Sequence, residues 1–354
     1  MPGNGKPENA SALSNKKFRL IFTGLFILFI VFFLLDLFLG SVTIRPGDII
    51  NAAFNKADNV TQMILMQFRL PKAVTAIMAG MALSISGLQM QTLFRNPMAG
   101  PYVLGLSSGA SLGVAFVIMG FSSSFTPDAV KSLGNWAIAV SSWAGAGFVM
   151  ILIMIISSKV KNIMTVLILG IMLSSGISAI VSIMQYFSNE TMLKTYIIWT
   201  MGSLGNLTSS QLNVLIISVM AGVLLSFFSV KMLNALLLGE DYSRSIGLEI
   251  KMSRIVIITG TSILAGTITA FCGPIGFIGI AVPHLARILF RTSDHKILVP
   301  ATILTGSIVM LAGDIISQMP GSDNVLPVNS VTALIGIPVV IWVILRDRKY
   351  REIF

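Results

Sequence analysis

The residues that could carry out chemistry are scattered in this chain. Several serines lie close to glycines, and His284 could act as a general base, as a serine hydrolase inside a membrane would need. These serines are Ser84, Ser86, Ser108 and Ser174. None of them forms a G-x-S-x-G elbow with a matching partner, and serine hydroxyls in membrane helices commonly bond to their own backbone. An intramembrane enzyme is therefore only a distant third hypothesis.

Metal and nucleotide chemistry also lack the side chains they need. The chain has one cysteine, Cys272, and two histidines, His284 and His295, too few for the common cysteine and histidine metal sites. It contains no G-x-x-x-x-G-K-[ST] phosphate loop, and the nearest string, Gly3 to Pro7, has the wrong length. We expect no metal and no cofactor in this chain, no ATP binding and no enzymatic activity.

Two carboxylates raise the alternative of an ion-coupled secondary transporter. Asp36 and Asp314 stand inside apolar runs that hold no other acidic residue, and acidic groups at membrane depth often relay ions. Both fall near the predicted outer ends of their runs. Interfacial carboxylates with local partners are therefore favoured over an ion relay, and the secondary transporter stays open as the rival class.

The elements that position these residues are membrane spans. The 354 residues are 55% hydrophobic and 11% charged, against about 25% charged in an ordinary soluble domain. A helix crosses a bilayer with about 20 apolar residues, and the sequence predicts an all-α polytopic protein with about ten such helices. The predicted spans are 18–40, 71–94, 101–120, 135–157, 161–187, 211–231, 252–272, 276–291, 297–318 and 330–346. Residues 1–17 are predicted to be a disordered cytoplasmic tail, and 18–354 a single transmembrane domain.

The net charge of +10 is explained by topology. With ten spans, the Lys and Arg residues divide into 18 on the side of both termini and 6 on the other, which together make the 24 in the sequence. The positive-inside rule then places both termini in the cytoplasm. No basic face remains for nucleic acid, so the expected surroundings are membrane lipid.

Small residues predict how the spans pack. Helices in lipid approach closely where small side chains line a face, as at Gly80 and Ser84. The spacing from Gly80 through Gly87 to Pro97 recurs from Gly266 through Gly273 to Pro283. Because the second and seventh spans run in opposite directions, this repeat suggests an inverted duplication of spans 2–5 and 7–10, a construction common in transporters.

A long cytoplasmic segment follows the sixth span. Residues 234–248 can form two short helices that turn at Gly239 and Gly247, giving a compact knob with apolar and charged faces. Such a knob could dock into a groove on a soluble partner, while the alternative is a solvated loop.

At this point the sequence resembles the permease subunits of bacterial ABC importers for ferric siderophores, haem and cobalamin. The first part of the resemblance runs from Arg69-Leu-Pro-Lys72 through Gly80, Ser86-Gly87 and Gln91 to Arg95-Asn-Pro-Met-Ala99, then Pro101 and Leu104-Gly-Leu-Ser-Ser-Gly-Ala110. The second part is Leu238-Gly-Glu240, which is similar to the family's ATPase-coupling loop. The third part is Gly276-Phe-Ile-Gly279, Pro283-His284, Arg287, Asp294-His295, Asp314, Leu326-Pro327 and Gly336-Ile-Pro338.

The resemblance implies an importer in the bacterial inner membrane. Two copies of the chain would enclose the substrate path, two separate ATPase subunits would supply ATP and Mg, and a periplasmic or lipid-anchored binding protein would deliver the substrate. A ferric siderophore is the first choice of substrate, because it is the commonest in the family, and haem and cobalamin remain open. The cytoplasmic coupling helices, at about 233–248, would contact the ATPase through Leu236, Leu238, Gly239, Glu240, Asp241, Arg244 and Gly247.

The resemblance also implies roles at the other sites. Arg69 and Lys72 would dock the binding protein, although they could instead snorkel to the interface, and Asn96 and Met98 would form a cytoplasmic gate, although a helix cap explains them equally well. His284 and Arg287 are expected to be structural. Some members of the family have an arginine at Gln318 and a glutamate at Val325, and a glycine is frequent at Asn329, so the docking charge and a turn of the outer face are expected to differ here. The predicted path residues are Ser174, Ser178, Ser182 and Met184.

Overall fold

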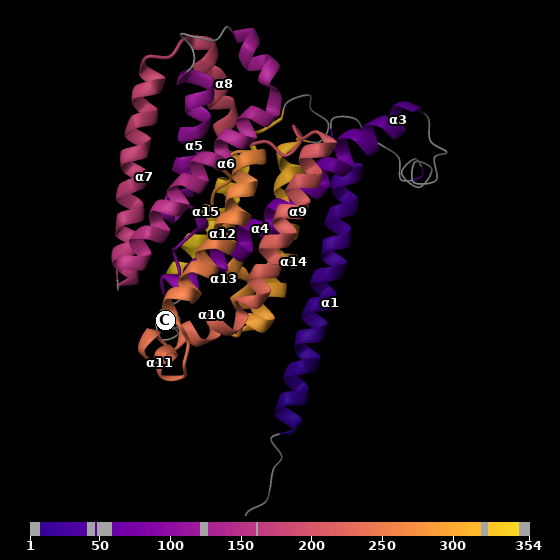
Figure 1. Ribbon diagram of the computed structural model, residues 1–354. Helices are drawn as coiled ribbons and strands as arrows, with labels where there is room; N and C mark the ends of the chain where they lie inside the picture. The colour runs from indigo at the N-terminus through magenta and orange to yellow at the C-terminus, as the bar shows by residue number, and fades with distance from the viewer. Residues whose placement is uncertain are drawn as a thin grey trace, which may run out of the picture.

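The fold was described from a computed structural model of the chain. The structure describes residues 8–40, 47, 59–120, 127–160, 162–319 and 325–346. The regular secondary structure in these ranges is helical. Figure 1 shows the helices as a bundle, with α1 along one side and the short α10 and α11 at one end. The elements are α1 (Glu8–Phe38), α3 (Asn59–Met63), η1 (Ile64–Arg69), α4 (Leu70–Leu93), η2 (Pro101–Leu104), α5 (Leu106–Ala115), η3 (Phe116–Gly120), α6 (Pro127–Lys159), α7 (Ile163–Tyr186), α8 (Glu190–Thr200), α9 (Ser209–Phe228), α10 (Val230–Leu237), α11 (Glu240–Ser245), α12 (Ile250–Cys272), α13 (Ile278–Phe290), α14 (His295–Ser317) and α15 (Val328–Arg346).

The apolar helices match the predicted spans. Among the described residues, seven helices are long and apolar enough to cross a membrane, and three shorter apolar helices lie at 106–120, 278–290 and 328–343. These ten segments fall on the ten predicted spans, in order. The all-α polytopic fold is therefore confirmed.

Helix α1 extends beyond the first predicted span into the segment predicted as a tail. Helix α1 begins at Glu8, so residues 8–17 are helical, and residues 1–7 lie outside the described part. The physical reason is that the first span continues into a segment containing Glu, Ala and Leu, which are good helix formers. Most side chains of Lys16–Phe38 are exposed in the single chain, as expected for a helix that faces lipid.

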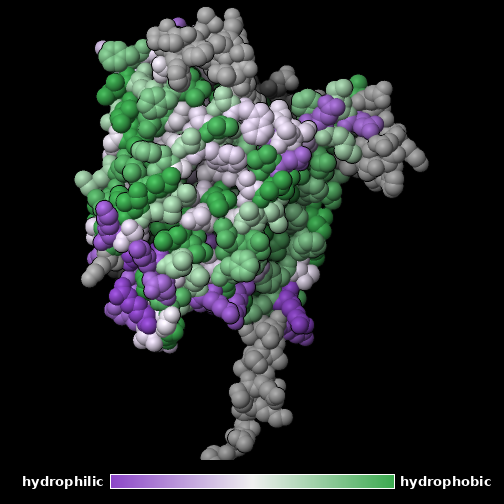
Figure 2. All heavy atoms as spheres, viewed as in Figure 1, coloured by the Kyte–Doolittle hydropathy of each residue, from purple (hydrophilic) through white to green (hydrophobic). Residues whose placement is uncertain are grey.

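The surface of the molecule is divided by polarity. Hydrophobic side chains cover the sides in the view of Figure 2, while hydrophilic ones gather at the end that carries α11, with a smaller group near α3. Large apolar side chains such as Met172 on α7, Ile217 on α9 and Leu334 on α15 are more than 60% exposed. Lipid can cover such surfaces, because hydrocarbon chains do not penalise apolar side chains.

Helix α4 lies at the centre of the bundle and packs through its small residues. Among its buried residues are Gly80 and Gly87. A Cβ added at Gly80 would lie 2.2 Å from the carbonyl oxygen of Gly306 on α14, and one at Gly87 would lie 1.7 Å from that of Gly279 on α13. Only glycine permits these approaches, so the small residues predicted to build the bundle do bring its helices together.

The contacts of the two halves follow one pattern. In the predicted repeat, α4, α5 and α6 of the first half correspond to α12, α13 and α14 of the second. Helix α4 packs on α14, and its counterpart α12 packs on α6. Likewise α5 packs on α6, and its counterpart α13 packs on α14. Lys72, near the start of α4, lies against Gly205, and the amide of Ser203 donates to the carbonyl of Cys272 at the end of α12. The start of α4 therefore lies near the end of α12, and the two helices run in opposite directions, as an inverted repeat requires.

Candidate functional site

The predicted knob is formed by α10 and α11. The two helices meet at Gly239, whose φ of 104° and ψ of 156° are adopted almost only by glycine. The knob ends at Gly247, whose φ is 86°. Both glycines predicted to make corners therefore have backbone conformations that favour glycine.

The knob exposes apolar side chains at the hydrophilic end of the molecule. Leu238 is 64% exposed, Tyr242 50% and Ile246 56%. Asp241 and Arg244 are exposed beside them. Leu236, predicted as a partner contact, is only 3% exposed and packs in the same apolar cluster as Phe94 at the end of α4. Within the chain, Leu236 therefore anchors the knob to the bundle, and the exposed Leu238, Tyr242 and Ile246 are the apolar side chains available to a partner.

Glu240 ties the knob to the spans. Its Oε1 atom lies 2.6 Å from Nη2 of Arg254 on α12, and Nη1 of Arg254 donates to the carbonyl of Val160 at the end of α6, at 3.2 Å. The Arg254 side chain is 5% exposed, so this ion pair is shielded from water. The knob is thus held against both α6 and α12.

The predicted gate lies in the link between α4 and η2. Arg95 adopts a left-handed φ of 46°, and the Oδ1 atom of Asn96 accepts the backbone N–H of Met98 at 2.9 Å. Nε2 of His284 on α13 lies 2.9 Å from the carbonyl oxygen of Pro97. The side chain of Asn96 therefore closes its own turn and caps no helix, while Met98 is 38% exposed, and the gate stays a prediction.

A buried polar contact lies directly before this link. Nη1 of Arg287 on α13 donates to Oε1 of Gln91 on α4, and Nε2 of Gln91 donates to the carbonyl of Ile280 at 3.2 Å. Gln91 is fully buried and Arg287 is 4% exposed. These bonds and the contact of His284 join α13 to the end of α4, which is the structural role expected for His284 and Arg287.

The two basic residues predicted to dock a binding protein, Arg69 and Lys72, both have partners within the chain. Nζ of Lys72 lies 3.1 Å from Oδ1 of Asp314, which is fully buried on α14. Gln318 bridges two carboxylates, because its Nε2 atom lies 2.8 Å from Oδ2 of Asp314 and 3.1 Å from Oδ1 of Asp36. Lys72 is therefore the cationic partner of a buried acid.

Arg69 is also used internally. Its Nη1 atom donates to the carbonyls of Leu37 at 2.6 Å and Phe38 at 2.9 Å, at the end of α1, and the residue is 9% exposed. The π-helical turn η1 leads directly into α4 and ends at Arg69. Within the chain, Arg69 and Lys72 connect α1, α4 and α14, and their docking of a binding protein stays a prediction.

The predicted path residues share α7 but differ in exposure. Ser178 and Ser182 are exposed, whereas Ser174 and Met184 are half-buried. The Ser182 hydroxyl donates to the carbonyl of Ser178 at 3.0 Å, and that of Ser174 to the carbonyl of Gly170 at 2.8 Å. Because these hydroxyls are satisfied within the helix, α7 can present them to lipid or to a path.

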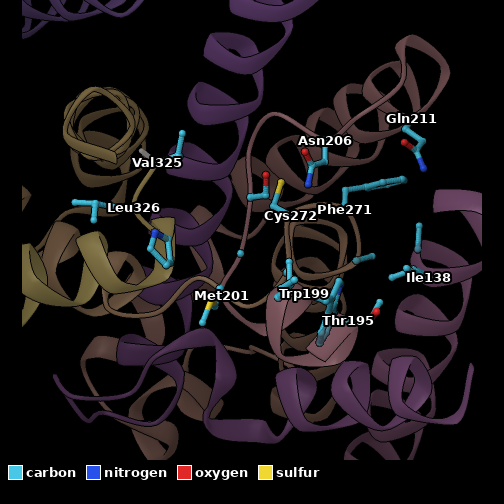
Figure 3. Close-up of a pocket in the computed structure, with 17 residues that line it drawn as sticks. Ile138, Thr195, Trp199, Met201, Asn206, Gln211, Phe271, Cys272, Val325 and Leu326 are labelled. Carbon is cyan, nitrogen blue, oxygen red and sulfur yellow. The ribbon is translucent and has the colours of Figure 1, made fainter. Parts of the chain in front are cut away.

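A cavity of about 390 Å³ opens at the end opposite the knob, between α6, α8 and α12. Figure 3 shows Thr195, Trp199, Asn206 and Phe271 among its lining side chains. None of the four predicted path residues lines it. This cavity therefore does not coincide with the predicted path.

Sequence reasoning missed one buried polar cluster. His295, at the start of α14, is fully buried and contacts Thr92 on α4 and Asn234 on α10. The sequence places Asn234 at the first position of the knob segment and the Asp294-His295 pair among the family motifs, but it assigns no contact between them. The available signal was a polar residue, His295, in the first turn of an apolar span. Its partners Thr92 and Asn234 lie 203 and 61 positions away, so the sequence does not indicate them.

The polytopic helical fold and the anchored knob define a membrane permease. The chain belongs to the FecCD transport family, whose model matches residues 28–346. It is accordingly a permease of an ABC importer in the inner membrane and not itself an enzyme. Permeases of this class work with ATPase subunits and a substrate-binding protein.

Relatives of known name are similar along almost the whole chain. A protein of Methanocaldococcus jannaschii named as an ABC transporter permease is 34% identical, over 92% of this chain and 96% of its own length. The vitamin B12 import system permease protein BtuC of Klebsiella pneumoniae is 33% identical, over 95% and 96%. A solved metal-chelate type ABC transporter in an inward-facing conformation matches 93% of this chain and 99% of its own, with 27% identity and a TM-score of 0.81.

Proposed function

We propose that two copies of this chain enclose the membrane path of an ATP-driven importer whose cargo is a large metal chelate. The name of the Klebsiella relative specifies vitamin B12, and the solved relative is of metal-chelate type. Both cargoes are metal complexes held by an organic ligand. The energy would come from ATP and Mg on two ATPase subunits bound to the knobs.

The observation that carries this proposal is the knob. Leu238, Tyr242 and Ile246 expose apolar surface next to Asp241 and Arg244, at the hydrophilic end of the bundle. Apolar groups rimmed by charge mark a protein interface, and here no hydrocarbon would cover them. The buried ion pair behind the knob would let a push on its surface reach the spans.

The rival ion-coupled transporter has weaker support. Asp36 and Asp314 would be its candidate relay, yet Asp314 is paired with Lys72, and Gln318 donates to both carboxylates. Carboxylates with such fixed partners fit local satisfaction better than a mobile ion path. The cytoplasmic position of both termini and of the knob is part of the proposal, and it rests on the distribution of positive charge.

The energy source can be tested in proteoliposomes that contain the permease and its ATPase, with the loaded binding protein outside and ATP inside. We expect uptake that requires ATP and that persists when an uncoupler collapses the proton gradient. Uptake that is driven by the gradient without ATP would overturn the proposal and support the secondary transporter.

The knob can be tested by Gly239→Ala. A Cβ in this backbone conformation costs about 1–3 kcal/mol of strain, so we expect the corner to shift and both uptake and ATPase retention on the purified permease to fall. Gly24→Ala is the matched control, because Gly24 is helical with no atom within 4 Å of its added Cβ. Normal retention of the ATPase by Gly239→Ala would contradict the docking role of the knob.

The cargo has two leading candidates. A ferric siderophore was the first choice from the sequence, and the name of the Klebsiella relative now favours cobalamin as its rival. The cognate binding protein should be heated with a ferric siderophore, haem or cyanocobalamin, since a ligand that binds the native state raises Tm. A rise of Tm with one compound would identify the cargo, while no rise with any of them would reject a chelate.

A further inference from the structure

His295 stands where three helices meet near the knob. It is the first residue of α14 and is fully buried. Its Nδ1 atom lies 2.8 Å from Oδ1 of Asn234 on α10, and its Nε2 atom lies 2.8 Å from Oγ1 of Thr92 on α4. One imidazole ring therefore bridges a helix of the knob and the last turn of α4.

The orientation of Asn234 is fixed by its other partners. Its Oδ1 atom also accepts the backbone N–H of His295 at 2.9 Å, and its Nδ2 atom donates to Oδ1 of Asp294 at 2.7 Å. Partial burial would raise the pKa of Asp294, but hydrogen bonds from the Lys296 amide and Asn234 lower it below its usual value, so the group is an acceptor at neutral pH. Oδ1 of Asn234 must face the ring.

This orientation of the Asn234 amide determines which nitrogen of the His295 ring carries the hydrogen. An amide oxygen only accepts, so Nδ1 of His295 must donate to Asn234. In the neutral imidazole Nε2 is then an acceptor, and the Thr92 hydroxyl must donate to it. The same hydroxyl lies 3.0 Å from the carbonyl of Leu88 and has a single hydrogen. The bond to His295 thus competes with a bond inside α4.

The end of α4 continues directly into the predicted gate. Thr92 precedes Asn96 by four residues and Met98 by six, and Arg95 lies beside the knob, with Nη1 3.9 Å from a Cβ built at Gly239. Apolar contacts also join α10 to the end of α4, because Leu233 of α10 belongs to the same buried cluster as Leu93 of α4. Apolar contacts can slide, whereas hydrogen bonds buried away from water hold a direction and a distance.

We propose that His295 is a positioning residue, which transmits displacement of α10 to the end of α4 and so to the link of Asn96 and Met98. The inference rests on the proposed function of the knob. The bridge adds a directional polar connection that the apolar cluster alone does not provide. Its loss should separate ATP hydrolysis from transport more than it weakens the fold.

The test uses the whole transporter in proteoliposomes and measures the ATP hydrolysed per substrate imported. Thr92→Val keeps the shape of the side chain but removes the hydroxyl, and His295→Leu removes both ring bonds. We expect either change to raise the ATP cost per substrate about tenfold, the size of effect of one buried coupling contact. Thr92→Ser retains the hydroxyl and should restore the wild-type ratio.

The matched control is Thr75→Val. Thr75 is a buried threonine on the same helix, with the same type of bond to the carbonyl four residues earlier, but it lies far from the knob in the chain. We expect it to leave the ratio within about twofold, because it breaks no contact between helices. An equal effect of Thr75→Val would show that Thr92 acts only on the stability of α4 and would overturn the proposal.

A second readout follows the gate itself. Cys272 is 2% exposed, so a cysteine introduced by Met98→Cys should be the group that reacts with a polar maleimide. We expect ATP to change the reaction rate in the parent and not with Thr92→Val added. An unchanged response to ATP with Thr92→Val would overturn the inference. If the parent shows no response to ATP and is also found to bind no ATPase, the proposed function of the knob would be rejected instead.

Discussion

At the scale of single residues, the charged side chains at the end opposite the knob are bound to one another. Asp36 and Asp314 are almost completely buried, and Lys72, Arg69 and Gln318 supply the donors around them or around the end of α1. A buried acid requires such partners, because desolvation of an unpaired charge is costly. The cluster therefore serves first to hold α1, α4 and α14 together.

This role predicts the effect of Lys72→Met. The change leaves Asp314 without its cation, and breaking a buried pair costs about 3 kcal/mol or more. We expect a lower Tm in detergent, measured by thermal unfolding, and recovery when Asp314→Asn is added. Lys194→Met, at an exposed lysine, should have no effect. If Lys72→Met leaves Tm unchanged but weakens the affinity for the binding protein, Lys72 acts in docking and not in holding the helices together.

At the scale of elements, similar spacing does not mean similar packing. Gly80 and Gly266 occupy equivalent places in the repeated spacing, on α4 and α12. A Cβ at Gly80 would lie 2.2 Å from the Gly306 carbonyl, while one at Gly266 would lie 3.8 Å from Cβ of Ala146. The contact between α4 and α14 is thus closer at this point than its counterpart between α12 and α6.

The difference gives a prediction with an internal control. Gly80→Ala forces α4 and α14 apart and should cost about 1–3 kcal/mol or more, as overpacking does. Gly266→Ala should change stability little, because its new methyl group makes an ordinary contact. Thermal unfolding of the two purified variants would compare them. Equal Tm values would mean that the close approach at Gly80 contributes nothing to stability.

At the scale of the whole molecule, the proposed pairing of two copies can be tested through α7. Ser178 is exposed on this helix, which carries the predicted path residues, and Ile217 is exposed on α9. We expect Ser178→Cys to form a disulfide-linked dimer under mild oxidation in membranes, and Ile217→Cys to remain a monomer. Cys272 is buried and should not contribute. A dimer linked through Ile217→Cys alone would place the axis elsewhere.

The sequence by itself determined the number and order of the spans and the place of the knob. A bilayer requires about 20 apolar residues per crossing, and corners such as Gly239 require glycine, so both leave local signals. The resemblance of ordered motifs identified the family for the same reason, since it needed no knowledge of contacts.

Only the tertiary structure decided which polar residues meet. Gln318 reaches Asp36 across 282 positions, and His295 reaches Thr92 across 203. Local patterns place a residue on a helix but do not choose its partner on another one. The sequence therefore predicts an outer docking role for Arg69 and Lys72 and a partner contact for Leu236, but it does not indicate that all three also have partners inside the chain. The physical reason is that burial and pairing depend on how helices far apart in sequence pack together.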